Sequence, residues 1–129
     1  MLNKSNLNHE EWLKKAGEDE EAGRKLLEDG GPFGSACFHF QQMVEKLLKG
    51  LLVFHEKEPP RTHDLIDLET VLKDIEPNIE NYKRELDLLN SYYIETRYPG
   101  DFPEIFADET KQAFEAAQQL KIFILSRVG

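Results

Sequence analysis

The sequence of 129 residues is poor in cysteine and has no long uninterrupted apolar run. Its single cysteine, Cys37, excludes an intramolecular disulfide, and a lone free thiol is typical of a reducing compartment. Every apolar stretch is interrupted by charge within a few residues, so we expect neither a signal-like nor a membrane-spanning segment. These absences predict a soluble, cytoplasmic protein.

An excess of positive charge is also absent. The chain has 16 basic against 25 acidic residues, which gives a net charge of −9. A protein that holds nucleic acid mainly through its phosphates needs a concentrated basic face. We therefore expect no extended nucleic-acid binding, although a local pair of lysines can still hold one phosphate or an acidic neighbour.

Sequence patterns of metal binding and catalysis are missing as well. No two histidines have metal-ligand spacing, and no inward Glu-x-x-His pair occurs on two helices. Cys37 and His39 lie two residues apart on one predicted helix and so point in different directions. The glycines of the segment 30–34 match neither a P-loop nor a dinucleotide-binding pattern. We expect no metal, no cofactor and no catalytic residue.

Helical periodicity is what the chain has in abundance. Asn8 and Glu11 form a predicted capping box at the start of the first helix, and Thr62 is a predicted cap of the third. Nothing alternates with period two for long enough to form a strand. We predict a single domain over residues 1–129, all-α, an up-and-down bundle of four main helices plus one short extra helix. The expected helices cover residues 8–28, 34–56, 63–74, 77–93 and 108–127.

The long second helix has two differently composed sides. Its apolar side repeats at intervals of three and four residues, as expected for a core-facing helix, and consists of Ala36, Phe40, Met43, Val44, Leu47, Leu48, Leu51 and Phe54. A second line, the polar stripe, consists of His39, Gln42, Lys46 and Lys49 at intervals of three, four and three. The polar stripe is a candidate binding surface. The alternative is that its lysines are ordinary solvated charges.

Asp19 lies within the apolar side of the first helix, between Ala16 and Gly23. A carboxylate that faces inward is costly unless it is paired or hydrogen-bonded. We expect its partner to be a cation of the second helix or Arg97. The alternative is a position at the edge of the bundle, where Asp19 stays solvated.

Two short segments hold further candidate residues. His63 lies at a predicted helix start, where the helix dipole disfavours its charged form, so we expect a neutral, hydrogen-bonded ring. A capping or packing role is the simpler interpretation of His63. Arg97, in the predicted loop 94–106, can form a forked pair with Asp19 or contact a phosphate.

The end of the last helix, Ile122-Phe123-Ile124-Leu125, is apolar nearly all the way round. Such an end needs cover, which predicts a subunit interface.

Several of these segments, taken in order, resemble the HEPN domain over residues 8–127. The similarity is carried by Trp12, Ala16 and Asp19, by Cys37-Phe38-His39, Gln41-Gln42, Glu45-Lys46 and Lys49, by Thr62-His63-Asp64-Leu65, and by Arg97-Tyr98-Pro99. The resemblance implies a helical bundle that commonly dimerises. It also implies a two-component, toxin–antitoxin arrangement with a small nucleotidyltransferase, and binding of a nucleotide or RNA. The candidate ligand- or partner-binding residues are Asp19, His39, Gln42, Lys46, Lys49, His63, Arg97 and Tyr98.

The chain departs from the pattern of HEPN ribonucleases. Many of these carry an arginine followed, after four to six residues, by a histidine, and no arginine here has a histidine at that distance. We therefore expect a non-catalytic, dimeric HEPN module that binds a small nucleotidyltransferase, a nucleotide, or both. The alternative is a divergent ribonuclease that uses His39 or His63 with Arg97.

Overall fold

The amphipathic segments of the chain fold as helices around one long central helix. The computed structural model describes residues 7–93 and 104–129. These contain α1 (His9–Glu28), α2 (Phe33–Phe54), α3 (Leu65–Leu72), the 3-10 helix η2 (Pro77–Tyr82), α4 (Lys83–Asn90) and α5 (Ala107–Val128). No strand occurs in this part of the chain, and the predicted all-α class is confirmed.

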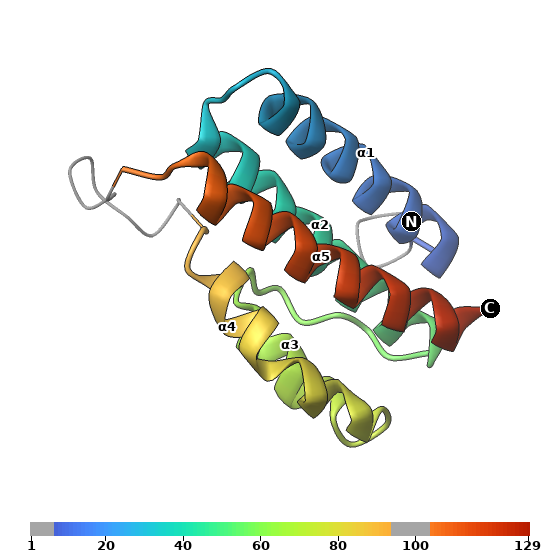
Figure 1. The fold of residues 1–129 in the computed structure, drawn as a ribbon. Helices are drawn as coiled ribbons and strands as arrows, with labels where there is room; N and C mark the ends of the chain where they lie inside the picture. The colour runs from blue at the N-terminus through green and yellow to red at the C-terminus, as the bar shows by residue number, and fades with distance from the viewer. Residues whose placement is uncertain (1–6, 94–103) are drawn as a thin grey trace.

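The helices form an up-and-down arrangement with α2 in its middle. In Figure 1, α1 and α4 run in one direction, whereas α2 and α5 run in the other. Helix α2 packs against α1 on one side and α5 on another, and α4 lies beside α5. The short α3 packs on α2 and α4. No helix in the described ranges is long and apolar enough to cross a membrane.

The core lies along the apolar side of α2. Phe40, Leu48 and Leu51 are completely buried, as most of the predicted core-facing residues are. Helix α1 approaches α2 closely at Gly23, where an added Cβ would lie 2.5 Å from a ring carbon of Phe40. Phe54, the last residue of α2, is the exception: it is 39% exposed, and its ring contacts the His9 ring edge-on at 5.2 Å.

The start of α1 confirms the predicted capping box. The Asn8 side chain accepts a hydrogen bond from the Glu11 backbone N–H at 2.8 Å, and the Glu11 carboxylate accepts one from the Asn8 N–H at 3.0 Å. The reciprocal pair satisfies two of the free N–H groups at the helix end. The capping box thereby defines the residue at which α1 begins.

The predicted start of the third helix was wrong by two residues. Helix α3 begins at Leu65 and its cap is Asp64, whose side chain accepts from the Ile66 N–H at 2.8 Å. Thr62 instead accepts from the Asp64 N–H at 3.1 Å and donates to Asp67. The physical reason is tertiary: the Asn90 amide of α4 donates to the Asp64 carboxylate at 2.9 Å and favours it as the cap.

The predicted fourth helix is divided and shorter than expected. Its first six residues form the 3-10 helix η2, and α4 ends at Asn90. Tyr93, the last residue of the expected helix 77–93, consequently lies beyond α4 and is half-buried. At the end of α5, Phe123 and Ile124 are buried, whereas Ile122 and Leu125 are 64% and 42% exposed.

Candidate functional site

A groove of about 1120 Å³ lies between α1, α2 and the segment 58–63. Below it is called the α1–α2 groove. Its lining has four lysine or arginine side chains and four carboxylates, so these charges balance. The lining charges and histidines are Lys15, Lys46, Lys49, Arg61, Glu18, Asp19, Glu45, Glu58, His39 and His63. The segment 58–63 reaches the groove through Pro59-Pro60, because residues before proline stay extended.

Asp19 connects α1 to the polar stripe. Its two carboxylate oxygens have separate partners, His39 Nδ1 at 2.9 Å and the Lys46 ammonium group. The Asp19 side chain is 13% exposed, so the pairs are partly desolvated. The expectation that a cation of the second helix pairs with Asp19 is therefore confirmed, and Asp19 is not left solvated at the edge.

Glu45, on α2, forms a second cluster in which one carboxylate again bonds a lysine and a histidine. Its carboxylate accepts from Lys49 Nζ at 3.0 Å and from His63 Nδ1, which lies 3.2 Å from both oxygens. Gln42 Nε2 donates to the same carboxylate at 3.3 Å. The Glu45 side chain is only 5% exposed, and these donors compensate its burial.

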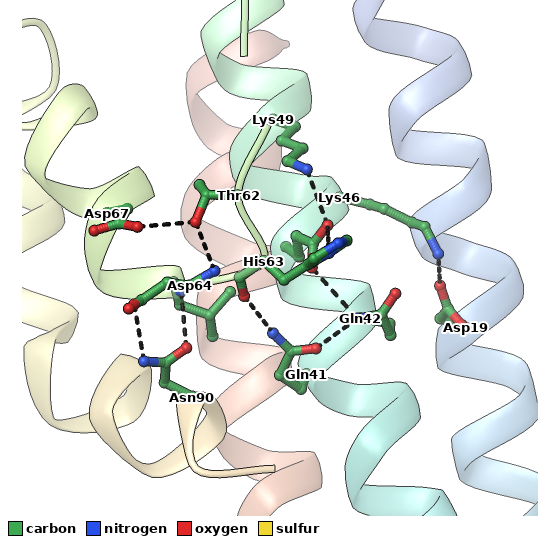
Figure 2. Close-up of polar contacts among 12 residues, drawn as sticks. Asp19, Gln41, Gln42, Lys46, Lys49, Thr62, His63, Asp64, Asp67 and Asn90 are labelled. Carbon is green, nitrogen blue, oxygen red and sulfur yellow. Dashed lines mark hydrogen bonds and ion pairs between the residues drawn. The ribbon is translucent and has the colours of Figure 1, made fainter. Parts of the chain in front are cut away.

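The Glu45 cluster closes into a ring of hydrogen bonds, shown in Figure 2. The amide nitrogen of Gln41 donates to the backbone oxygen of His63 at 2.9 Å. The amide oxygen of Gln41 accepts from Gln42 Nε2 at 2.7 Å, and the same Gln42 nitrogen reaches Glu45. His63 then returns to Glu45 through Nδ1. The ring ties the segment 58–63 to α2.

His63 is held in place by the residues that follow it and by an aromatic neighbour. The next two residues are anchored by Asn90, which donates to Asp64 and accepts from the Leu65 N–H at 2.8 Å. The imidazole stacks on the ring of Tyr93, with centroids 4.7 Å apart and planes 12° from parallel. His63 is thus hydrogen-bonded, as expected, and it packs on an aromatic ring without capping α3.

The two imidazoles present the same edge to the groove. A carboxylate only accepts hydrogen bonds, so Nδ1 of His39 and of His63 carries the proton in the neutral ring. Among the described residues, neither Nε2 atom has a hydrogen-bond partner. Each Nε2 is therefore available to a ligand.

Lys49 is the most buried member of the polar stripe. The residue is 8% exposed, and its ammonium lies 5.8 Å from the centroid of the Trp12 ring. Trp12 also lines the groove, and its Nε1 is the single buried side-chain polar atom without a partner in the described part of the chain. The lysines of the polar stripe are consequently not ordinary solvated charges.

The structure brings six of the eight sequence-predicted residues to one groove. These are Asp19, His39, Gln42, Lys46, Lys49 and His63. Arg97 and Tyr98 lie outside the described residues. The binding role of all eight stays a prediction.

Glu45 and Gln41 take part in the site but were not among the residues predicted from the sequence. A usable signal was present for Glu45, since it precedes Lys49 by one helical turn, the spacing of an intrahelical ion pair. Gln41 lies in a segment that carries the HEPN resemblance, but no helical spacing marks it, because its partner is a backbone oxygen 22 residues away in the chain.

The shifted pKa values lie outside the groove. Burial raises the pKa of the Cys37 thiol, which keeps it protonated and a poor nucleophile. Burial, together with donation to Glu109, raises the pKa of the Tyr92 hydroxyl above its ordinary value. Within residues 7–93 and 104–129, no group of three histidine, cysteine or acidic side chains is arranged to hold a metal ion.

Comparison with known proteins identifies the family. The family model described as HEPN domain matches residues 9–126, nearly the whole chain. The chain belongs to the HEPN family. The HEPN resemblance seen in the sequence is confirmed, and with it the helical bundle.

Two solved structures share the HEPN fold of this chain. TT1696 from Thermus thermophilus has 28% identity and a TM-score of 0.76, covering 92% of this chain and 97% of its own. ST0689, an archaeal HEPN homologue, has 23% identity and a TM-score of 0.75, covering 95% and 99%. No curated protein matches.

Proposed function

We propose that this protein is a non-catalytic HEPN module that binds a nucleotide through its phosphate in the α1–α2 groove. The observation that carries the proposal is Lys46, which lines the groove with one ammonium bond directed to Asp19. An ammonium group has three donors, so donors remain for a phosphate oxygen. The groove volume of about 1120 Å³ is slightly above the usual size of small-ligand sites, about 300–1,000 Å³, so a nucleotide has room in it.

The charge balance of the groove supports one phosphate-bearing ligand over a polymer. Four carboxylates offset the four lysine and arginine side chains of the lining. A polyanion needs a continuous basic track, which a balanced groove on a chain of net charge −9 does not offer. A single phosphate needs only local donors, such as the N–H groups of the Lys46 ammonium that Asp19 does not use.

Calorimetric titration with ATP tests the proposal. We expect saturable binding that weakens about tenfold or more in Lys46→Ala, because a charged hydrogen bond contributes about 1.5–3 kcal/mol. Lys111→Ala is the matched control, since Lys111 is exposed on α5 outside the groove. The absence of heat at millimolar ATP would overturn nucleotide binding.

We also propose that the module forms a homodimer and docks a small nucleotidyltransferase. The exposed Ile122 and Leu125 on α5 support a subunit interface, and HEPN domains often dimerise. Light scattering on the purified protein should give twice the chain mass, and Ile122→Asp should give a monomer. Gln112→Asp, ten residues before Ile122 on α5 and also exposed, is the matched control. A monomeric wild-type protein would contradict the dimer.

Docking of the nucleotidyltransferase has its own test. Co-expression with a small nucleotidyltransferase from a neighbouring reading frame should yield a complex that co-elutes in size-exclusion chromatography. Separate elution of the two proteins would overturn docking.

One observation favours divergent RNA cleavage as the second candidate function. His39 and His63 each bond a carboxylate through Nδ1 and line the same groove, an arrangement that suits proton transfer through Nε2. If this candidate is right, purified protein degrades structured RNA, and His39→Ala and His63→Ala do not. Intact RNA after incubation with the wild type would exclude it.

A further inference from the structure

One wall of the α1–α2 groove ends in a pair of stacked rings. The His63 imidazole lines the groove, whereas Tyr93, stacked on it at 4.7 Å, is not part of the lining. The His63 side chain is 51% exposed although Tyr93 covers one of its faces. The exposure therefore comes from the other face and the Nε2 edge. A flat ring supported by a second ring is a surface on which a nucleobase stacks.

Beside this ring pair, the groove has a hydrogen-bond acceptor whose direction is fixed. The backbone oxygen of His63 only accepts, so the amide nitrogen of Gln41 must face it and the Gln41 oxygen must face Gln42. The Gln42 nitrogen is then placed between two acceptors, Gln41 Oε1 and Glu45 Oε1. As a result, Gln42 Oε1 points away from the hydrogen-bonded ring. No described residue donates to it.

We propose that His63, supported by Tyr93, and the carbonyl oxygen of Gln42 form a recognition site for a nucleobase that carries an amino group. The inference rests on the proposed nucleotide binding and specifies which nucleotides the groove accepts. An amino group on the stacked base supplies the donor that the Gln42 oxygen lacks. A base without it leaves a partly buried carbonyl unpaired, which is the stronger form of discrimination.

Three ligands separate the parts of this site in one calorimetric series. AMP carries the amino group, purine riboside 5′-monophosphate lacks only that group, and ribose 5-phosphate lacks the base. We expect AMP to bind about five- to tenfold more tightly than purine riboside 5′-monophosphate, the effect of one hydrogen bond. The analogue should bind roughly tenfold more tightly than ribose 5-phosphate because of stacking.

Variants assign each difference to its residue. Gln42→Leu should abolish the difference between AMP and the analogue. Tyr93→Leu should bring both base-bearing ligands towards ribose 5-phosphate, and Tyr93→Phe should retain wild-type affinities. Gln118→Leu is the matched control, since it removes a half-buried glutamine outside the groove. Thermal unfolding of each variant verifies that it is folded.

The results distinguish failure of the base-recognition site from failure of nucleotide binding. Equal binding of AMP, the analogue and ribose 5-phosphate would overturn the base-recognition site and leave phosphate binding in the groove intact. Preference for AMP that survives Gln42→Leu would overturn the role of the Gln42 oxygen. Failure of all three ligands to bind would overturn nucleotide binding itself, and the base-recognition site with it.

Discussion

Two carboxylates of the α1–α2 groove, Asp19 and Glu45, are each shared by one histidine and one lysine, but in different surroundings. Asp19 connects α1 to α2, its side chain is 13% exposed, and both of its partners are residues of the polar stripe. Glu45 is 5% exposed and accepts a further bond from Gln42 within a closed ring. Similar side chains thus occupy an open position and an enclosed one.

The difference separates a position that a ligand can perturb from one that the fold requires. A phosphate that approaches Lys46 competes with Asp19, which still has solvent on one side. Glu45 has no comparable freedom, because its loss would leave the buried ammonium of Lys49 without its partner. We therefore assign ligand exchange to the Asp19 cluster and the placement of His63 to the Glu45 cluster.

Removal of Glu45 should have the largest effect on stability. In Glu45→Ala, the Lys49 side chain, 10% exposed, becomes an unpaired buried charge. We expect a loss of about 3–5 kcal/mol in the free energy of unfolding, measured by urea denaturation. The double variant Glu45→Leu/Lys49→Met should recover most of it. A loss below about 1 kcal/mol, the value of an exposed ion pair, would contradict the view that the fold requires Glu45.

Gly23→Ala should disturb the Asp19 cluster through the backbone. Gly23 lies one helical turn after Asp19, and its Cβ would come within 2.5 Å of the buried Phe40 ring, so α1 must move outward. We expect a loss of about 1–3 kcal/mol by denaturation. Gly17→Ala is the matched control, because nothing lies within 4 Å of its Cβ, and it should stabilise α1 slightly. Equal effects at the two glycines would contradict the close approach.

Asp19→Asn should cost less stability and change ligand binding. We expect about 1 kcal/mol of destabilisation, because the neutral amide keeps an acceptor for His39. Phosphate affinity, measured by calorimetry, should rise a few-fold as Lys46 loses its competing carboxylate. Glu18→Gln is the control, since among the described residues Glu18 lines the groove without an ion pair. Weaker phosphate binding in Asp19→Asn would contradict the competition between Asp19 and the phosphate for Lys46.

The smallest effect is expected at Glu20, a carboxylate that links α1 to α5. Burial raises its pKa, but hydrogen bonds from Gln118 and Lys121 outweigh burial and lower the pKa below the ordinary 4.5. A lowered pKa in the folded state stabilises the protein above pH 4.5, and this stabilisation is lost as the pH falls through the folded-state value. Glu20→Gln should flatten the pH dependence of unfolding there. An unchanged acid profile would contradict this.

Helical periodicity and capping patterns predicted most of the helices correctly. They failed where a residue distant in the chain contacts the end of a helix. The capping box of Asn8 was correct because both of its members are three residues apart. The start of α3 was wrong because Asn90, 26 residues later, selects Asp64 over Thr62 as the cap. Tyr93 was expected to end the fourth helix, but α4 ends before it and its ring stacks on His63.

The amino-acid pattern was enough to predict the all-α class, the family and the alignment of His39, Gln42, Lys46 and Lys49 on one side of α2. Helical periodicity and capping act over three or four residues, so a linear pattern contains them completely. The enclosure of Glu45 and the position of His63 in the wall of the groove depend instead on how distant segments pack. Those contacts join residues 18 or more positions apart, and their geometry exists only once α1, α2 and the segment 58–63 have packed together.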